Sequence, residues 1–94
     1  MTDFWLVCYD LRDNKRRNKL AKLMEQRCQR VQYSVFECPL EEETLGFLME
    51  NRWLKVLDLS QDSLRAYPLN QTAKKQAKIY GSPPLCEPPD YLIF

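Results

Sequence analysis

The strongest constraint in this sequence is the run Phe4–Tyr9, six residues without a charge, followed at once by Asp10. Its length and its aromatic and β-branched residues favour a β-strand. A strand with one face in water alternates apolar and polar residues, whereas this run is apolar on both faces. We therefore expect a strand that is covered on both faces and that ends in a carboxylate.

Helical and strand patterns alternate along the rest of the chain. Asp13 is suited to cap a helix that reaches about Cys28, because its side chain accepts the free amides of a first turn. Pro39 ends a strand-like segment, and the glutamates 41–43 suit the start of a second helix. The predicted elements are strands over 4–10, 30–38 and 62–69, helices over 13–28 and 41–57, a short helix or turn over 71–78, and a short strand at 79–80.

Ninety-four residues are enough for one small core. We expect one domain over residues 1–80 and a proline-rich arm over 81–94, which ends in the strand-like tetrad Tyr91–Phe94. Two helices can cover only one face of the sheet. A homodimer with the sheets face to face would cover the other face; the alternative is a curled sheet covered by the tail.

Charge is distributed unevenly, although the net charge is only +1. Residues 12–30 carry eight cations against two acids, whereas residues 37–62 carry seven acids against two cations. The chain has no histidine, and its four cysteines lack a CxxC spacing, which argues against a zinc site. Neither an export signal nor a membrane-spanning run is visible, so we expect no membrane partner and a cytoplasmic location.

Four features occur in a characteristic order. They are the strand end Tyr9-Asp10, the basic helix start Lys15-Arg16-Arg17, the segment RVQYSVFEC (30–38) and the segment DSLRAYPL (62–69). Together they resemble the CRISPR-associated endoribonuclease family known as Cas-two, over residues 4–80. The resemblance implies an α+β fold, a ferredoxin-like βαββαβ sandwich with an extra C-terminal strand, dimerising through the sheet face. It also requires a tight, kinked strand pair within RVQYSVFEC, which has no Gly or Asn turn.

The same resemblance implies a catalytic site at Asp10 and Tyr9, with Asp10 as the metal ligand. One carboxylate is too few for a protein-only site, but Mg2+ keeps water and phosphate oxygens in its coordination shell. The expected cofactor is Mg2+ or Mn2+, one ion shared by two copies of Asp10 at the dimer two-fold axis. It would acidify a bound water and stabilise charge on the phosphate. The alternative is that Asp10 is only a turn residue between strand and helix.

The resemblance further places six residues in a nucleic-acid-binding cleft: Lys15, Arg16, Arg17, Arg30, Ser34 and Phe36. Arginine can hold a phosphate with a bidentate pair of hydrogen bonds. The alternatives are a solvated helix face for the basic residues and a core or interface position for Tyr9 and Phe36.

The implied function is CRISPR adaptation, the acquisition of spacers, by a dimer that binds nucleic-acid backbone. Metal-dependent endonuclease activity on single-stranded RNA or duplex DNA would accompany it, which makes the chain a phosphodiester hydrolase. One alternative is a non-catalytic scaffold that bridges dimers of the CRISPR integrase Cas-one. Another is a toxin-type ribonuclease of the same fold. An RNA-binding module is disfavoured, because the glycine-aromatic ribonucleoprotein motif is missing.

Overall fold

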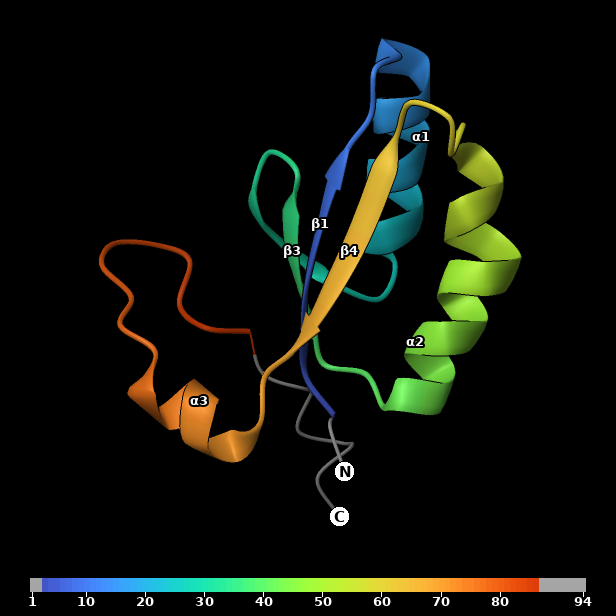
Figure 1. Ribbon diagram of the computed structural model, residues 1–94. Helices are drawn as coiled ribbons and strands as arrows, with labels where there is room; N and C mark the ends of the chain where they lie inside the picture. The colour runs from blue at the N-terminus through green and yellow to red at the C-terminus, as the bar shows by residue number, and fades with distance from the viewer. Residues whose placement is uncertain (1–2, 87–94) are drawn as a thin grey trace.

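The computed structural model describes residues 3–86 (Figure 1). Its elements are β1 (Trp5–Asp10), α1 (Asn14–Glu25), β2 (Gln29–Gln32), β3 (Val35–Cys38), α2 (Glu42–Leu48), η1 (Met49–Trp53), η2 (Leu54–Val56), β4 (Ser63–Pro68) and α3 (Gln71–Gln76). The order β1-α1-β2-β3-α2-β4 is the one that the sequence predicted.

The four strands form one antiparallel sheet in the order β2-β3-β1-β4. The apolar strand β1 therefore lies inside the sheet, between β3 and β4. Figure 1 shows α1 and α2 together on one side of the sheet. This topology and layering confirm the ferredoxin-like βαββαβ sandwich.

The register of β1 separates its two faces. Val7 and Tyr9 point toward the helices and are buried, while Leu6 and Cys8 point to the opposite face and are only half-buried. In this register Asp10 is exposed on the helix-free face, which we call the open face. The helix-side core is filled by large apolar side chains, among them Leu20, Met24, Phe36 and Trp53.

The segment RVQYSVFEC forms the tight pair that the family resemblance required. β2 and β3 are separated only by Tyr33 and Ser34, and the register between them shifts between Arg30 and Gln32. Such a bulge adds twist to a pair that has no glycine in its turn. The hairpin thereby leaves Tyr33 64% exposed while Phe36 is completely buried.

Both helices follow the sequence prediction closely. Asp13 caps α1 by accepting the backbone N–H of Arg16 at 2.9 Å. α1 ends at Glu25 rather than near Cys28, because a turn over 26–28 leads the chain directly into β2. α2 continues through the π-helical η1 and the 3-10-helical η2, so the helical run reaches Val56. Within this run Trp53 faces the core and Arg52 is exposed.

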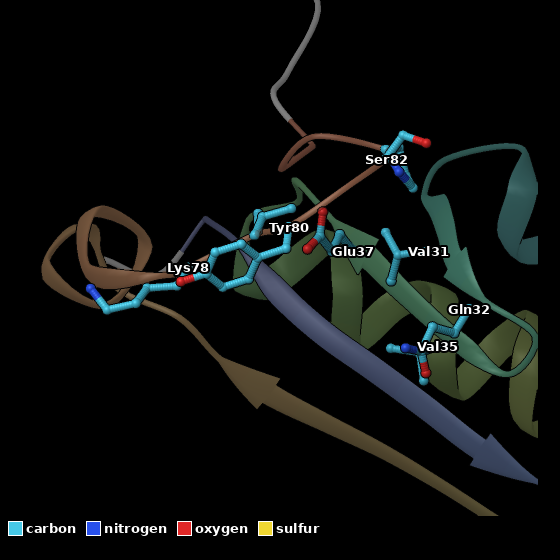
Figure 2. Close-up of a pocket in the computed structure, with 9 residues that line it drawn as sticks. Val31, Gln32, Val35, Glu37, Lys78, Tyr80 and Ser82 are labelled. Carbon is cyan, nitrogen blue, oxygen red and sulfur yellow. The ribbon is translucent and has the colours of Figure 1, made fainter.

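The segment between α3 and the arm differs from the prediction. Ile79 and Tyr80 form no strand, and Tyr80 is 90% exposed. Their predicted strand is wrong because neither residue pairs with an edge of the sheet. The arm instead returns to the open face, where the backbone N–H of Cys86 donates to Glu37 Oε1 at 2.8 Å. Lys78 and Tyr80, just before the arm, line a cavity of about 370 Å³ together with Val31, Val35 and Glu37 of the hairpin. Figure 2 shows Tyr80 beside Glu37 at this cavity.

The predicted terminal strand Tyr91–Phe94 lies outside the described residues, and the domain boundary at residue 80 stays a prediction. Over residues 3–86, no helix is both long enough and apolar enough to cross a bilayer.

The helix-side core generates a stability prediction with a control in the same helical run. Trp53 is 1% exposed, so Trp53→Ala should lower the free energy of unfolding by about 3–5 kcal/mol. Phe47 is 57% exposed, so Phe47→Ala should change it by about 0.5 kcal/mol or less. Urea denaturation followed by circular dichroism measures both. If both variants lost the same free energy of unfolding, Trp53 would not be the buried core residue that this structure shows.

Candidate functional site

Asp10 lies at the last position of β1, in a shallow cavity on the open face. Pairing with β4 places Asp10 opposite Ser63, and Cys8 opposite Arg65. The cavity has a volume of about 320 Å³, and its lining comprises Cys8, Tyr9, Asp10, Ser63, Arg65 and Tyr67. Within residues 3–86 no hydrogen bond engages the Asp10 carboxylate. The Asp10 carboxylate is therefore accessible from the cavity and does not close a turn.

A buried carboxylate, Asp62, holds the loop that follows Asp10. The Arg16 guanidinium donates from Nε to Asp62 Oδ2 at 3.0 Å and from Nη2 to Oδ1 at 3.2 Å. The backbone N–H groups of Arg12 and Asp58 each donate to the same carboxylate at 2.9 Å. The Asp62 side chain is 0% exposed. Sequence reasoning placed Asp62 only at the start of a strand and missed this contact.

The environment of Asp62 acts on its pKa in two directions. Burial favours the protonated acid and raises the pKa. The hydrogen bonds from the Arg12 and Asp58 amides and from the Arg16 guanidinium favour the anion, and together they outweigh burial. The pKa of Asp62 is consequently lowered below its ordinary value.

Arg17 is also engaged with the β1–α1 loop. Its Nη1 donates to the carbonyl oxygen of Leu11 at 2.8 Å and to that of Arg12 at 3.4 Å, and its Nη2 donates to Asn14 Oδ1 at 3.0 Å. Lys15, directly before the two arginines, is exposed. Of the three predicted basic residues in this turn, Lys15 is therefore the one whose charge serves no contact within the described chain.

Arg30 lies over two aromatic rings of the hairpin. Its Cζ is 4.9 Å from the ring centroid of Tyr33 and 5.7 Å from that of Phe36, and its Nε donates to the Tyr33 carbonyl at 2.8 Å. These distances are those of cation–π contacts. Phe36 is 0% exposed, so it offers nucleic acid no direct contact in this structure and instead supports Arg30 from below.

Tyr9 and Ser34 connect β1 to the same hairpin turn. The Tyr9 hydroxyl donates to the Tyr33 carbonyl at 3.3 Å, and the Tyr9 backbone N–H donates to the Ser34 carbonyl at 3.1 Å. The Tyr9 side chain is 5% exposed and its ring centroid is 6.1 Å from that of Phe36. Its position is that of a core aromatic next to Asp10, and its catalytic role stays a prediction.

The predicted site residues thus form two groups near one end of the sheet. Lys15, Arg16 and Arg17 lie in the first turn of α1. This helix follows the Asp10 end of β1 along the chain (Figure 1). Arg30, Ser34 and Phe36 belong to the β2–β3 hairpin, which contacts Tyr9. Sequence reasoning missed Ser63, Arg65 and Tyr67, which share the Asp10 cavity. Their signal was the alternation of β4, which places all three on one face.

The residues present fit a metal ion only in part. Among residues 3–86, no three carboxylate, thiol or imidazole groups converge on a point that could hold a metal. Asp10 supplies one oxygen ligand of the kind that Mg2+ prefers. Water, a phosphate oxygen or a second copy of Asp10 would have to supply the others.

The Cys38 thiol is buried in the core and is poorly suited to bind a metal ion. A hydrogen bond with Cys28 and burial raise the pKa of the Cys38 thiol. The thiolate, not the thiol, is the form that binds metals, so Cys38 serves as a small apolar side chain.

Comparison with known proteins gives a consistent result. The chain matches the family described as CRISPR associated protein Cas2 over residues 1–77. It is 71% identical over 91 residues to the CRISPR-associated endoribonuclease Cas2 2 of Synechocystis sp.. This match covers 97% of this chain and 98% of that protein. It is 45% identical over 83 residues to the CRISPR-associated endonuclease Cas2 2 of Thermus thermophilus, which covers 88% and 87% respectively.

A solved structure extends the likeness to an assembly. A chain of a partial Cas6-RT-Cas1–Cas2 complex is similar with a TM-score of 0.73 and 28% identity, over 95% of both chains.

The Asp62 contacts predict a specific dependence of stability on pH. Because the folded pKa is lowered, the stabilisation is fully present above about pH 4 and is lost as the pH falls through the folded pKa. Asp62→Asn should therefore lower the Tm at pH 7, and its difference from wild type should shrink below pH 4. Thermal unfolding from pH 2 to pH 7 measures this difference.

The control is Glu50→Gln, which changes an exposed carboxylate of η1, inside the helical run, that contacts no cation within salt-bridge distance in the described chain. Its Tm profile should match that of wild type. A Tm difference between Asp62→Asn and wild type that stays constant down to pH 2 would contradict the role assigned to the Asp62 anion.

Proposed function

The chain belongs to the CRISPR-associated Cas2 family, and we propose that it acts in spacer acquisition as a dimer that binds nucleic-acid backbone and cleaves it at Asp10 in a metal-dependent reaction. The observation that carries this proposal is the position of Asp10. Its carboxylate ends an inner strand of the sheet, yet it is exposed in a cavity and free of hydrogen bonds within residues 3–86. A turn residue would use its oxygens locally, whereas this one is available to a ligand.

The cofactor of the proposal is Mg2+ or Mn2+, held by Asp10. When bound, such an ion acidifies a water molecule and neutralises charge on the phosphate. The chain itself contributes an oxygen ligand of fixed position, because β1 is hydrogen-bonded on both sides and the loop after it is held by Asp62. It contains no histidine, so it lacks the usual general base of a nuclease.

The proposed binding surface for the backbone is α1. Lys15, Lys19 and Lys22 are exposed, and the helix carries no acidic residue in its first turn. Cations on a helix attract phosphate groups without reading bases, which suits a protein that must accept any incoming sequence.

A second copy of the chain would complete the open face. Leu6, Cys8 and Val35 lie half-buried on it, and Tyr67 is 46% exposed. The arm covers this face beside β2 and β3, and the Asp10 cavity on the β4 side is outside the arm's cavity. Face-to-face pairing of two sheets would cover the apolar residues of this face and bring a second Asp10 toward the first. Such a homodimer would allow two copies of Asp10 to hold one shared metal ion.

The scaffold function is the second candidate, and the proposed partner is the integrase Cas1. It rests on the similarity to a chain of the partial Cas6-RT-Cas1–Cas2 complex. A dimer that holds duplex DNA on its basic helices would serve this function with or without cleavage. The toxin-type ribonuclease is disfavoured, because the named relatives are CRISPR-associated proteins.

Removing the Asp10 carboxylate separates the two candidates. Asp10→Asn should lower the cleavage rate of labelled single-stranded RNA or duplex DNA by on the order of 100-fold or more, since an amide is a much poorer metal ligand. Chelator should have the same effect on wild type. Retention of the nucleic acid on a filter should be unchanged. Glu50→Gln, an exposed carboxylate of η1, is the matched control and should cleave like wild type.

Two outcomes would overturn the catalytic part of the proposal. One is equal cleavage by Asp10→Asn and wild type, and the other is equal cleavage with and without divalent metal. Salt-sensitive retention without cleavage in any sample would support the scaffold instead.

The exposed lysines of α1 give a prediction for backbone binding. Replacing both Lys15 and Lys19 with Gln should flatten the dependence of log affinity on log salt by roughly 0.9 per lost contact with duplex DNA. Arg16 is a poor probe, because its loss would also leave Asp62 buried without its partner. Lys55→Gln on η2 is the control and should keep the wild-type slope. Fluorescence anisotropy at several salt concentrations measures this slope. An unchanged slope of log affinity against log salt in the double variant would place the backbone-binding surface outside α1.

A further inference from the structure

We propose that Arg65 of β4 binds the phosphate that is cleaved at Asp10, and that the hydroxyl of Tyr67 positions its guanidinium. The expected ligand is a phosphodiester group of single-stranded RNA. The inference deepens the proposed function and rests on it for the cleavage step, but phosphate binding by Arg65 can be measured without cleavage.

The sheet register brings Arg65 to Asp10 although the two are far apart in sequence. Arg65 is paired with Cys8, two residues before Asp10, and Asp10 is paired with Ser63. Arg65 and Asp10 are therefore diagonal neighbours on the open face, and both line the same cavity. Diagonal neighbours stand roughly 7–8 Å apart. That spacing is between backbone positions and is within reach of a long side chain, yet Arg65 and Asp10 form no ion pair within 4.0 Å in the described residues. Both charged groups are therefore available to a phosphate group that enters the cavity.

Arg65 carries a charge that the described chain does not neutralise. Within residues 3–86 no carboxylate lies within 4.0 Å of its guanidinium, while Arg16 is paired with Asp62. Arg17 and Arg30 donate to backbone carbonyls. Arg65 Nη1 donates to the Tyr67 hydroxyl at 3.3 Å, and a guanidinium has four further N–H groups. Those groups remain for an anion.

An uncompensated cation has a physical purpose beside Asp10. A phosphodiester that approaches the carboxylate meets a like charge, and a guanidinium on the other side of the cavity offsets this repulsion. A planar guanidinium can also donate two parallel hydrogen bonds to phosphate oxygens. As negative charge builds on the phosphate during cleavage, these hydrogen bonds strengthen, which favours the transition state over the ground state.

Tyr67 acts through Arg65. It lies two residues further along β4 on the same face, and its hydroxyl accepts a hydrogen bond from the guanidinium. This contact limits the rotamers of a long, exposed side chain before substrate arrives. Tyr67 is thus a positioning residue, and its loss should reduce the rate more than the affinity.

The binding test uses a fluorescein-labelled single-stranded RNA of about ten nucleotides and the full chain with Asp10→Asn, which prevents cleavage. Adding Arg65→Gln should weaken binding on the order of tenfold and flatten the salt slope by about 0.7, the value for one contact with a single strand. Arg52→Gln, an exposed arginine of η1, is the matched control and should change neither quantity. Anisotropy titrations at three salt concentrations measure both.

The cleavage test uses the native Asp10 with Mn2+ or Mg2+. Arg65→Gln should lower kcat on the order of 100-fold. Arg65→Lys should restore part of it, because lysine keeps the charge but not the bidentate geometry. Tyr67→Phe should lower kcat with little change in KM. A purely structural role would not separate these two constants.

The outcomes separate this inference from the proposed function. If wild type does not cleave but Arg65→Gln loses affinity and salt slope, the phosphate site stands and the nuclease proposal falls. If wild type cleaves and Arg65→Gln binds and cleaves like Arg52→Gln, the nuclease stands and the role of Arg65 is overturned. The Tm and the size-exclusion elution volume of Arg65→Gln should match those of wild type. A shift of either in Arg65→Gln would assign Arg65 to the fold or the dimer and overturn the proposal.

Discussion

The buried carboxylate of Asp62 is the contact on which the site depends. A charge that is 0% exposed must be compensated, and here two backbone N–H groups and the Arg16 guanidinium compensate it. These donors come from the loop after β1, from the first turn of α1 and from the segment before β4. The contact therefore fixes the direction in which the chain leaves Asp10, and with it the position of the basic helix relative to the sheet.

This contact also divides the cations into two kinds. Arg16, Arg17 and Arg30 are half-buried and hydrogen-bonded to a carboxylate or to backbone carbonyls, so their first task is to hold the loop and the hairpin. The exposed lysines of α1 and Arg65 of β4 form no salt bridge within the described residues. A basic motif read from sequence contains both kinds, and only the hydrogen-bond partners distinguish them.

The two faces of the sheet have different tasks. One is closed by α1 and the α2–η2 run around Phe36 and Trp53, and it supplies the stability of a small domain. The open face carries Asp10, Arg65 and Tyr67 among half-buried apolar residues. The cavity lined by these residues contains one carboxylate, that of Asp10, whereas a metal ion needs several oxygen ligands. An incomplete site on an incompletely covered face is what a symmetric dimer with a nucleic-acid substrate would complete.

Much of this protein follows from local sequence. Side chains within a few residues of one another determine the apolar strand β1, the Asp13 cap and the order of strands and helices, and the motif residues identify the family. The hairpin turn at Tyr33–Ser34 needed the structure, because it carries no glycine or proline signal. The failure of Ile79–Tyr80 to form a strand also needed it, because Gly81 marks where a strand would end but not whether an edge of the sheet is available to pair with it. Only the tertiary structure placed Asp62 against Arg16, 46 residues away, and Arg65 diagonal to Asp10. Strand register and burial arise from packing between segments distant in the chain, and local propensity contains no information about that packing.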